Sequence, residues 1–88
     1  MRLREEVIIN EMDGEVIVVD ATSDPDKRFN GMLRMNKTAG FIAGLLQKDT
    51  NLDAIVLAMT AKYNVTEADA RRNAQKVIET FENIGLLV

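Results

Sequence analysis

Two apolar runs near the N-terminus are separated by the dipeptide Asp13-Gly14. The runs cover residues 7–12 and 15–19 and are rich in Val and Ile, which favour extended structure. Asp-Gly readily adopts the positive φ angles of a type I′ turn, so the sequence predicts a β-hairpin with a two-residue loop. The predicted cross-strand pairs are Met12 with Glu15, Asn10 with Ile17 and Ile8 with Val19 on one face, and Glu11 with Val16 and Ile9 with Val18 on the other.

Neither face of this hairpin is purely polar. One interpretation is that helices cover one face while the other contacts a partner or a second copy of the chain. The alternative is an ordinary surface with some exposed Val and Ile, since much of any protein surface is apolar.

A polar segment and a short third strand are expected after the hairpin. Residues 20–30 contain the single proline of the chain and show no regular period, so we expect a long mobile connection there. The third strand should follow at residues 31–34. Its length is limited by Gly31 on one side and by Asn36, a preferred helix N-cap residue, on the other.

From Asn36 onward, apolar residues follow a helical period in three segments. Each segment begins at a residue suited to capping a helix, namely Asn36, Asn51 and Thr66. Thr66 and Asp69 resemble a capping box with Asp in place of Glu or Gln, and Gly85 is suited to ending the third helix. The apolar stripes are Ala39, Ile42, Leu45 and Leu46, then Leu52, Ile55, Val56, Met59 and Tyr63, then Ala70, Ala74, Val77, Phe81 and Ile84.

Two glycines lie within the first predicted helix, at Gly40 and Gly44. Each destabilises a helix by about 1 kcal/mol relative to Ala, so another interaction should compensate. We expect the close approach of another helix or of the sheet. The alternative is a ligand resting against the bare backbone.

These elements predict an α+β fold, in which a three-stranded antiparallel sheet is followed by a three-helix bundle in a winged helix-turn-helix-like arrangement. A chain of 88 residues that is 47% apolar suits one domain, residues 1–88. It contains no Cys and no His, which removes the commonest nucleophile, general base and metal ligands. We found no phosphate loop, Ser nucleophile motif or calcium loop, so we predict no enzyme activity, no cofactor and no metal.

The charges are unevenly distributed along the chain. Residues 1–20 carry two bases and six acids, residues 21–50 five bases and three acids, and residues 51–88 four bases and five acids. Duplex-binding proteins usually show a clear basic excess, which this chain lacks. The start of the third helix, where a helix-turn-helix reads bases, holds Glu67 and Asp69 beside Arg71 and Arg72, so nucleic-acid binding is the less favoured alternative. No run of residues resembles a signal peptide or a membrane span, and we expect a soluble, cytoplasmic protein with no membrane association.

A groove is expected if the third strand is an edge strand and the third helix packs beside it. Arg71, Arg72, Gln75 and Lys76 lie off the apolar stripe of that helix. Their simplest interpretation is a solvated helical face. Beside an open strand edge, however, they would form a second wall facing main-chain hydrogen-bonding groups.

The segment Asn36-Lys37-Thr38-Ala39-Gly40-Phe41-Ile42-Ala43-Gly44-Leu45-Leu46 resembles the Asn-x-Thr-Ala-x-x-Ile-x-x-Leu-Leu segment of the coenzyme PQQ synthesis protein D (PqqD) family. The likeness continues through Ile55, through Tyr63-Asn64-Val65 and to the closing residues 81–86, and it covers residues 5 to 88. Most matched positions are core or cap residues, which report the fold more directly than the activity. Transfer of the PQQ pathway itself does not follow from the resemblance.

The resemblance implies a stand-alone peptide-binding adaptor, the recognition element of pathways that modify ribosomally made precursor peptides (RiPPs). Such a module holds the leader segment of the precursor as an added strand between the third strand and the third helix. It then presents the precursor to a modifying enzyme, often a radical SAM protein. The alternatives are a winged-helix DNA-binding protein and a subunit that forms a homodimer through the second hairpin face. By position, the resemblance implies a strand wall of Met32, Leu33, Arg34 and Met35 and a helix wall of Arg71, Arg72, Gln75 and Ile78.

Overall fold

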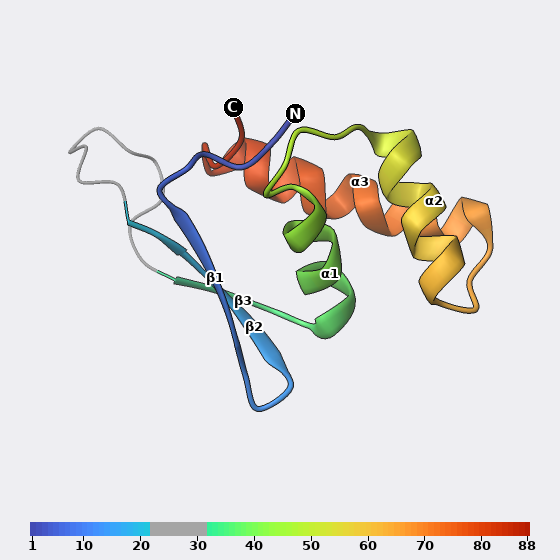
Figure 1. Ribbon diagram of the computed structural model, residues 1–88, viewed down its shortest axis with the longest axis horizontal. Coiled ribbons are helices and arrows are strands. Elements are labelled where there is room, and N and C mark those ends of the chain that lie inside the picture. The colour runs from blue at the N-terminus through green and yellow to red at the C-terminus, as the bar shows by residue number, and fades with distance from the viewer. Residues whose placement is uncertain (22–31) are drawn as a thin grey trace.

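The computed structural model describes residues 1–21 and 32–88 of the chain. In this part, three antiparallel strands in the order β1-β2-β3 are followed by three helices. Figure 1 shows the sheet beside α1, with α3 packed against both α1 and α2. The predicted α+β, winged helix-turn-helix-like arrangement is therefore confirmed. The elements are β1 (Val7–Met12), β2 (Glu15–Asp20), β3 (Met32–Met35), α1 (Lys37–Leu45), α2 (Leu52–Lys62) and α3 (Glu67–Asn83).

The hairpin of β1 and β2 has the predicted turn and register. Asp13 and Gly14 have φ angles of 51° and 80°, as a type I′ turn requires, and Met12 pairs with Glu15 directly beside it. The other predicted pairs are also present. One boundary was wrong, because Asp20 belongs to β2 and is buried. Residues 22–30 of the predicted connection and the predicted start of the third strand at Gly31 lie outside the described residues. The third strand ends at Met35, one residue later than predicted.

The sheet has one face toward the helices and one face toward solvent. Val7, Val16 and Val18 point inward and are buried, whereas Ile8, Met12 and Met32 lie on the outer face and are exposed. The N-terminal segment joins the core through Leu3, which forms a bridge with Leu87. The largest fully buried side chains are Phe81, Ile42, Leu46, Ile55, Met59, Leu86 and Val18.

All three predicted helix N-caps are present. The side-chain oxygens of Asn36 and Asn51 each accept a hydrogen bond of 2.8 Å from the backbone N–H three residues later, and Thr66 Oγ1 does the same at 3.1 Å. These bonds satisfy donors that the first turn of a helix leaves without partners. Only half of the capping box forms in the described part of the chain, because the Asp69 carboxylate accepts a hydrogen bond from Arg72 instead.

The C-terminal end of α3 is a Schellman motif centred on Gly85. Gly85 has a φ angle of 76°, and its N–H donates to the Glu82 carbonyl at 3.1 Å. The next N–H, of Leu86, donates to the Phe81 carbonyl at 2.9 Å. This pair of bonds turns the chain back so that Leu86 is fully buried, as the predicted role of Gly85 requires.

The two glycines of α1 differ in their surroundings. A Cβ atom at Gly40 would overlap the Val16 side chain, so α1 lies directly against β2 at this point. The expected close approach is thus confirmed for Gly40. It is wrong for Gly44, which is exposed and whose added Cβ would have no heavy atom within 4 Å outside its own helix.

We expect opposite effects of alanine at these two positions. Gly40→Ala should lower the free energy of unfolding by about 1–2 kcal/mol, because the overlap with Val16 outweighs the gain in helix propensity. Gly44→Ala should raise it by about 0.5–1 kcal/mol, because only the propensity changes. Urea unfolding of the two variants and the parent chain measures both values. Equal effects at the two sites would contradict the packing of α1 on Val16.

Candidate functional site

The strand β3 has an open main-chain edge. Among the described residues it pairs with β2 alone. The two residues that flank a two-residue hairpin loop, here Met12 and Glu15, form a hydrogen-bonded pair, and such pairs recur at every second residue. Glu15, Ile17 and Val19 therefore direct their N–H and C=O groups toward β1. The residues between them face β3, where they pair with Met35 and Leu33. The N–H and C=O groups of Met32 and Arg34 consequently point away from the sheet.

The side chains of β3 alternate between the two faces of the sheet. Leu33 and Met35 are half-buried and pack against the hydrophobic core. Met32 and Arg34 lie on the outer face, and Met32 is 66% exposed. The predicted strand wall therefore combines an open edge with two inward-facing apolar side chains.

A groove of about 300 Å³ begins where β3 ends. One side is formed by the start of α1, which contributes Asn36, Thr38, Ala39 and Ile42. The middle of α3 forms the other side. Its contribution is Asn73, Lys76 and Val77, which lie three and four residues apart and therefore share one face of the helix.

Arg71 lies on the other flank of α3, against α2. Its guanidinium donates to Asp53 of α2 at 3.0 Å and to Glu67 at 3.3 Å. These hydrogen bonds, chiefly the one to Asp53, raise the pKa of Arg71. Successive helical residues are about 100° apart, so Arg71 is separated from Asn73 by about 200° around the axis. The structure therefore does not bring Arg71 to the groove beside β3.

The remaining residues of the predicted helix wall do not line that groove either. Arg72 pairs with Asp69 at 3.0 Å on the exposed surface, and Gln75 is exposed two positions before Val77. Ile78 is buried in the core, with 7% of its surface exposed. The role of Arg71, Arg72, Gln75 and Ile78 in peptide binding stays a prediction.

The sequence analysis placed Lys76 on the second wall of the expected groove, but it missed Asn73 and Val77 as lining residues. Val77 belongs to the apolar stripe, as predicted, and is buried. The available signal was a pair of polar residues three positions apart, Asn73 and Lys76, next to Val77 of the apolar stripe. That signal does not identify which neighbouring element the flank faces.

Together, fold and site define a small winged helix-turn-helix-like domain that has an open strand edge and, after the end of that strand, a groove between two helices. The chain belongs to the Coenzyme PQQ synthesis protein D (PqqD) family, whose family model matches residues 5–87. A search of curated protein sequences found no match to this chain.

Two solved structures share this fold over nearly the whole chain. The structure described as TbiB1 in complex with the TbiA(beta) leader peptide has a TM-score of 0.78 and 21% sequence identity, covering 99% of this chain and 94% of that one. The structure described as lasso peptide synthetase B1 complexed with the leader peptide has a TM-score of 0.73 and 22% identity, covering 97% of this chain and 93% of that one. At these identities the likeness concerns the fold. In the described part of the chain, no helix has the length and apolar character needed to cross a membrane.

Proposed function

We propose that this protein binds the leader segment of a ribosomally made precursor peptide and presents it to a modifying enzyme. The observation that carries the proposal is the open edge of β3, where Met32 and Arg34 direct main-chain groups outward. A groove between α1 and α3 starts at Asn36, directly after this strand. An extended peptide that pairs with such an edge gains main-chain hydrogen bonds, and adjacent pockets select its side chains. Membership of the PqqD family and the leader peptides of the two similar structures support the same function.

The added strand would lie beside β3 with its inward side chains directed into the groove. Ala39 offers apolar surface there above the buried Ile42 and Val77, while Asn73 and Lys76 offer hydrogen-bond donors. This places the helix wall on the flank of α3 that faces α1. The wall implied by the family resemblance, at Arg71, Arg72, Gln75 and Ile78, is the competing assignment.

In this proposal the protein acts as an adaptor without chemistry of its own. It forms one domain over residues 1–88 and works in the cytoplasm, where precursor peptides are made. The modifying enzyme supplies the catalysis, and radical SAM enzymes are the first class to test as partners. The outer face of the sheet, with Ile8, Met12 and Met32 exposed, remains available for the enzyme or for a second copy of the chain.

The winged-helix alternative is disfavoured by the charges at the start of α3. Arg71 and Arg72 are both paired with carboxylates, of Asp53, Glu67 and Asp69. These carboxylates would repel the phosphates that a recognition helix must approach, and phosphate contacts supply most of the affinity for a duplex. The family and the similar structures offer no support for DNA binding.

The peptide can be identified by capture on the tagged domain and mass spectrometry, then mapped with amide NMR shifts. We expect shifts at residues 32–39 and 73–77 when a synthetic copy of the captured leader is added. Lys76→Glu should weaken binding of an acidic or polar leader by about fivefold or more, whereas Arg72→Glu should change it less than twofold. A larger loss of binding in Arg72→Glu than in Lys76→Glu would favour the helix wall implied by the family resemblance. Shifts confined elsewhere, or salt-dependent binding to duplex DNA instead, would contradict the proposed function.

A further inference from the structure

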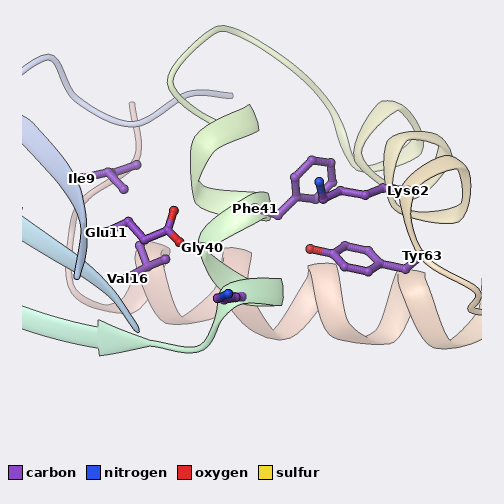
Figure 2. A pocket seen from close by; sticks show the side chains of 8 residues that line it. Ile9, Glu11, Val16, Gly40, Phe41, Lys62 and Tyr63 are labelled. Atoms are coloured by element: carbon purple, nitrogen blue, oxygen red, sulfur yellow. The ribbon is translucent and has the colours of Figure 1, made fainter. Parts of the chain in front are cut away.

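A second pocket lies on the opposite side of α1 from the groove. It has a volume of about 410 Å³, in the range of small-ligand sites. Its α1 wall consists of Lys37, Gly40 and Phe41, which share a helix face distinct from that of Thr38, Ala39 and Ile42 in the groove. The hairpin forms the second wall and the end of α2 the third (Figure 2). A ligand in this pocket would not compete for the edge of β3.

Two lysines line the pocket without a carboxylate partner among the described residues. Lys62 Nζ lies 5.2 Å from the ring centroid of Phe41 and 5.8 Å from that of Tyr63, so it rests on two aromatic rings. These rings meet edge to face at 5.7 Å. The Lys37 side chain runs along the hairpin turn, where its Cε lies 3.7 Å from the place of a Cβ atom on Gly14. Both ammonium groups are thus available to an anion.

A carboxylate and a phenol complete the polar groups of the pocket. In Figure 2 the Glu11 carboxylate extends from β1 toward α1, and the Tyr63 hydroxyl extends toward α1 from the end of α2 on the other side. Neither side chain forms a hydrogen bond within residues 1–21 and 32–88. Glu11 is the single carboxylate in the lining, so the two lysines outnumber it and the pocket favours a ligand with a net negative charge.

The rest of the lining is apolar. In Figure 2, Ile9 and Val16 of the hairpin lie on one side of α1 and Phe41 lies on the other. Val16 is buried against Gly40, so Ile9 and Phe41 supply the apolar surface of the pocket. An apolar side chain packed against Phe41 would lose contact with water, which is favourable for aliphatic and aromatic groups alike. The pocket thus offers three features to a ligand. Lys37 and Lys62 can donate hydrogen bonds to an anion, Glu11 can accept a hydrogen bond, and Phe41 provides apolar surface.

The last residue of a peptide chain has one group to match each of these features. It carries a carboxylate, an amide N–H and a side chain on one carbon atom. We propose that this pocket binds the apolar C-terminal residue of a peptide. Lys37, Lys62 and the Tyr63 hydroxyl hold the α-carboxylate, while Glu11 accepts the terminal amide N–H. The side chain packs against Phe41. This site is independent of the leader-binding function proposed above.

The proposal can be tested by NMR titration of the full chain with a synthetic hexapeptide that ends in Phe. The peptide with a free carboxylate should shift amides near Glu11, Lys37, Phe41 and Lys62, whereas the same peptide with a C-terminal amide should bind about fivefold to tenfold more weakly. N-acetyl-L-phenylalanine should bind at the same residues, no more tightly than the peptide. Tighter binding of this small acid than of the peptide would overturn the proposal in favour of a small-acid site.

Matched lysine variants test which cations hold the carboxylate. The double variant Lys37→Gln, Lys62→Gln should lose the preference for the free carboxylate, because both ammonium groups are gone. Lys48→Gln, which removes an exposed lysine outside the pocket, should keep it. A preference that survives the double variant, or equal binding of acid and amide by the parent chain, would overturn the proposal. Amide spectra of the free variants establish that each is folded.

Discussion

Replacing Arg34 by proline is expected to abolish strand addition at β3 while the domain remains folded. The N–H group of Arg34 points away from β2, so its loss removes no hydrogen bond within the sheet, and edge strands tolerate proline. An incoming peptide would lose one main-chain hydrogen bond and meet the proline ring at the edge. Together these effects should lower the affinity for the captured leader at least about tenfold. Isothermal titration calorimetry measures the change.

Two further variants separate the main chain from the side chain. Arg34→Ala removes a side chain on the outer face of the sheet and should bind the leader within about twofold of the parent chain. Leu33→Pro removes an N–H group that faces β2 and should destabilise the strand itself. If Arg34→Pro bound the leader as the parent does, the edge of β3 would not be the binding site.

Replacing Asp20 by alanine is expected to lower the free energy of unfolding by about 2–3 kcal/mol. The Asp20 side chain is 0% exposed, and its carboxylate accepts a hydrogen bond of 2.7 Å from Arg4 Nη2. Without it, the mostly buried Arg4 guanidinium would lose its counter-charge. Arg4 Nε already has no hydrogen-bond partner in the described part of the chain, so the loss would be poorly compensated.

The matched control is an exposed ion pair of the same type. Asp53 pairs with Arg71 at 3.0 Å, but its side chain is 85% exposed, so Asp53→Ala should change the free energy of unfolding by at most about 0.5 kcal/mol. Urea unfolding followed by circular dichroism compares the two variants. A similar small effect of both substitutions would show that burial of Asp20 does not contribute to stability.

The sequence alone predicted the elements whose structure depends on nearby residues. The turn at Asp13-Gly14 dictates the hairpin register, because only residues that tolerate positive φ fit a two-residue loop. The N-caps at Asn36, Asn51 and Thr66 satisfy amide donors three residues away. Each of these features is complete within four residues, so the local sequence was enough to predict it.

Asp20 shows where local reasoning failed. The residue begins a polar stretch and was assigned to the connection, but Arg4, sixteen residues earlier, draws its carboxylate into the protein. Gly44 is a second case. Its spacing from Gly40 predicted a packing role for both, yet only Gly40 faces Val16.

The candidate site combines a part that the sequence determined with a part that only the tertiary structure decided. The edge at Met32 to Met35 could be predicted, because a short strand between a hairpin and a capped helix pairs on one side. The helix wall could not. Both flanks of α3 carry polar residues at helical spacing, and the amphipathic pattern specifies only which face is buried. Packing of α2 against Arg71 and of α1 near Asn73 and Lys76 decided which flank borders the groove.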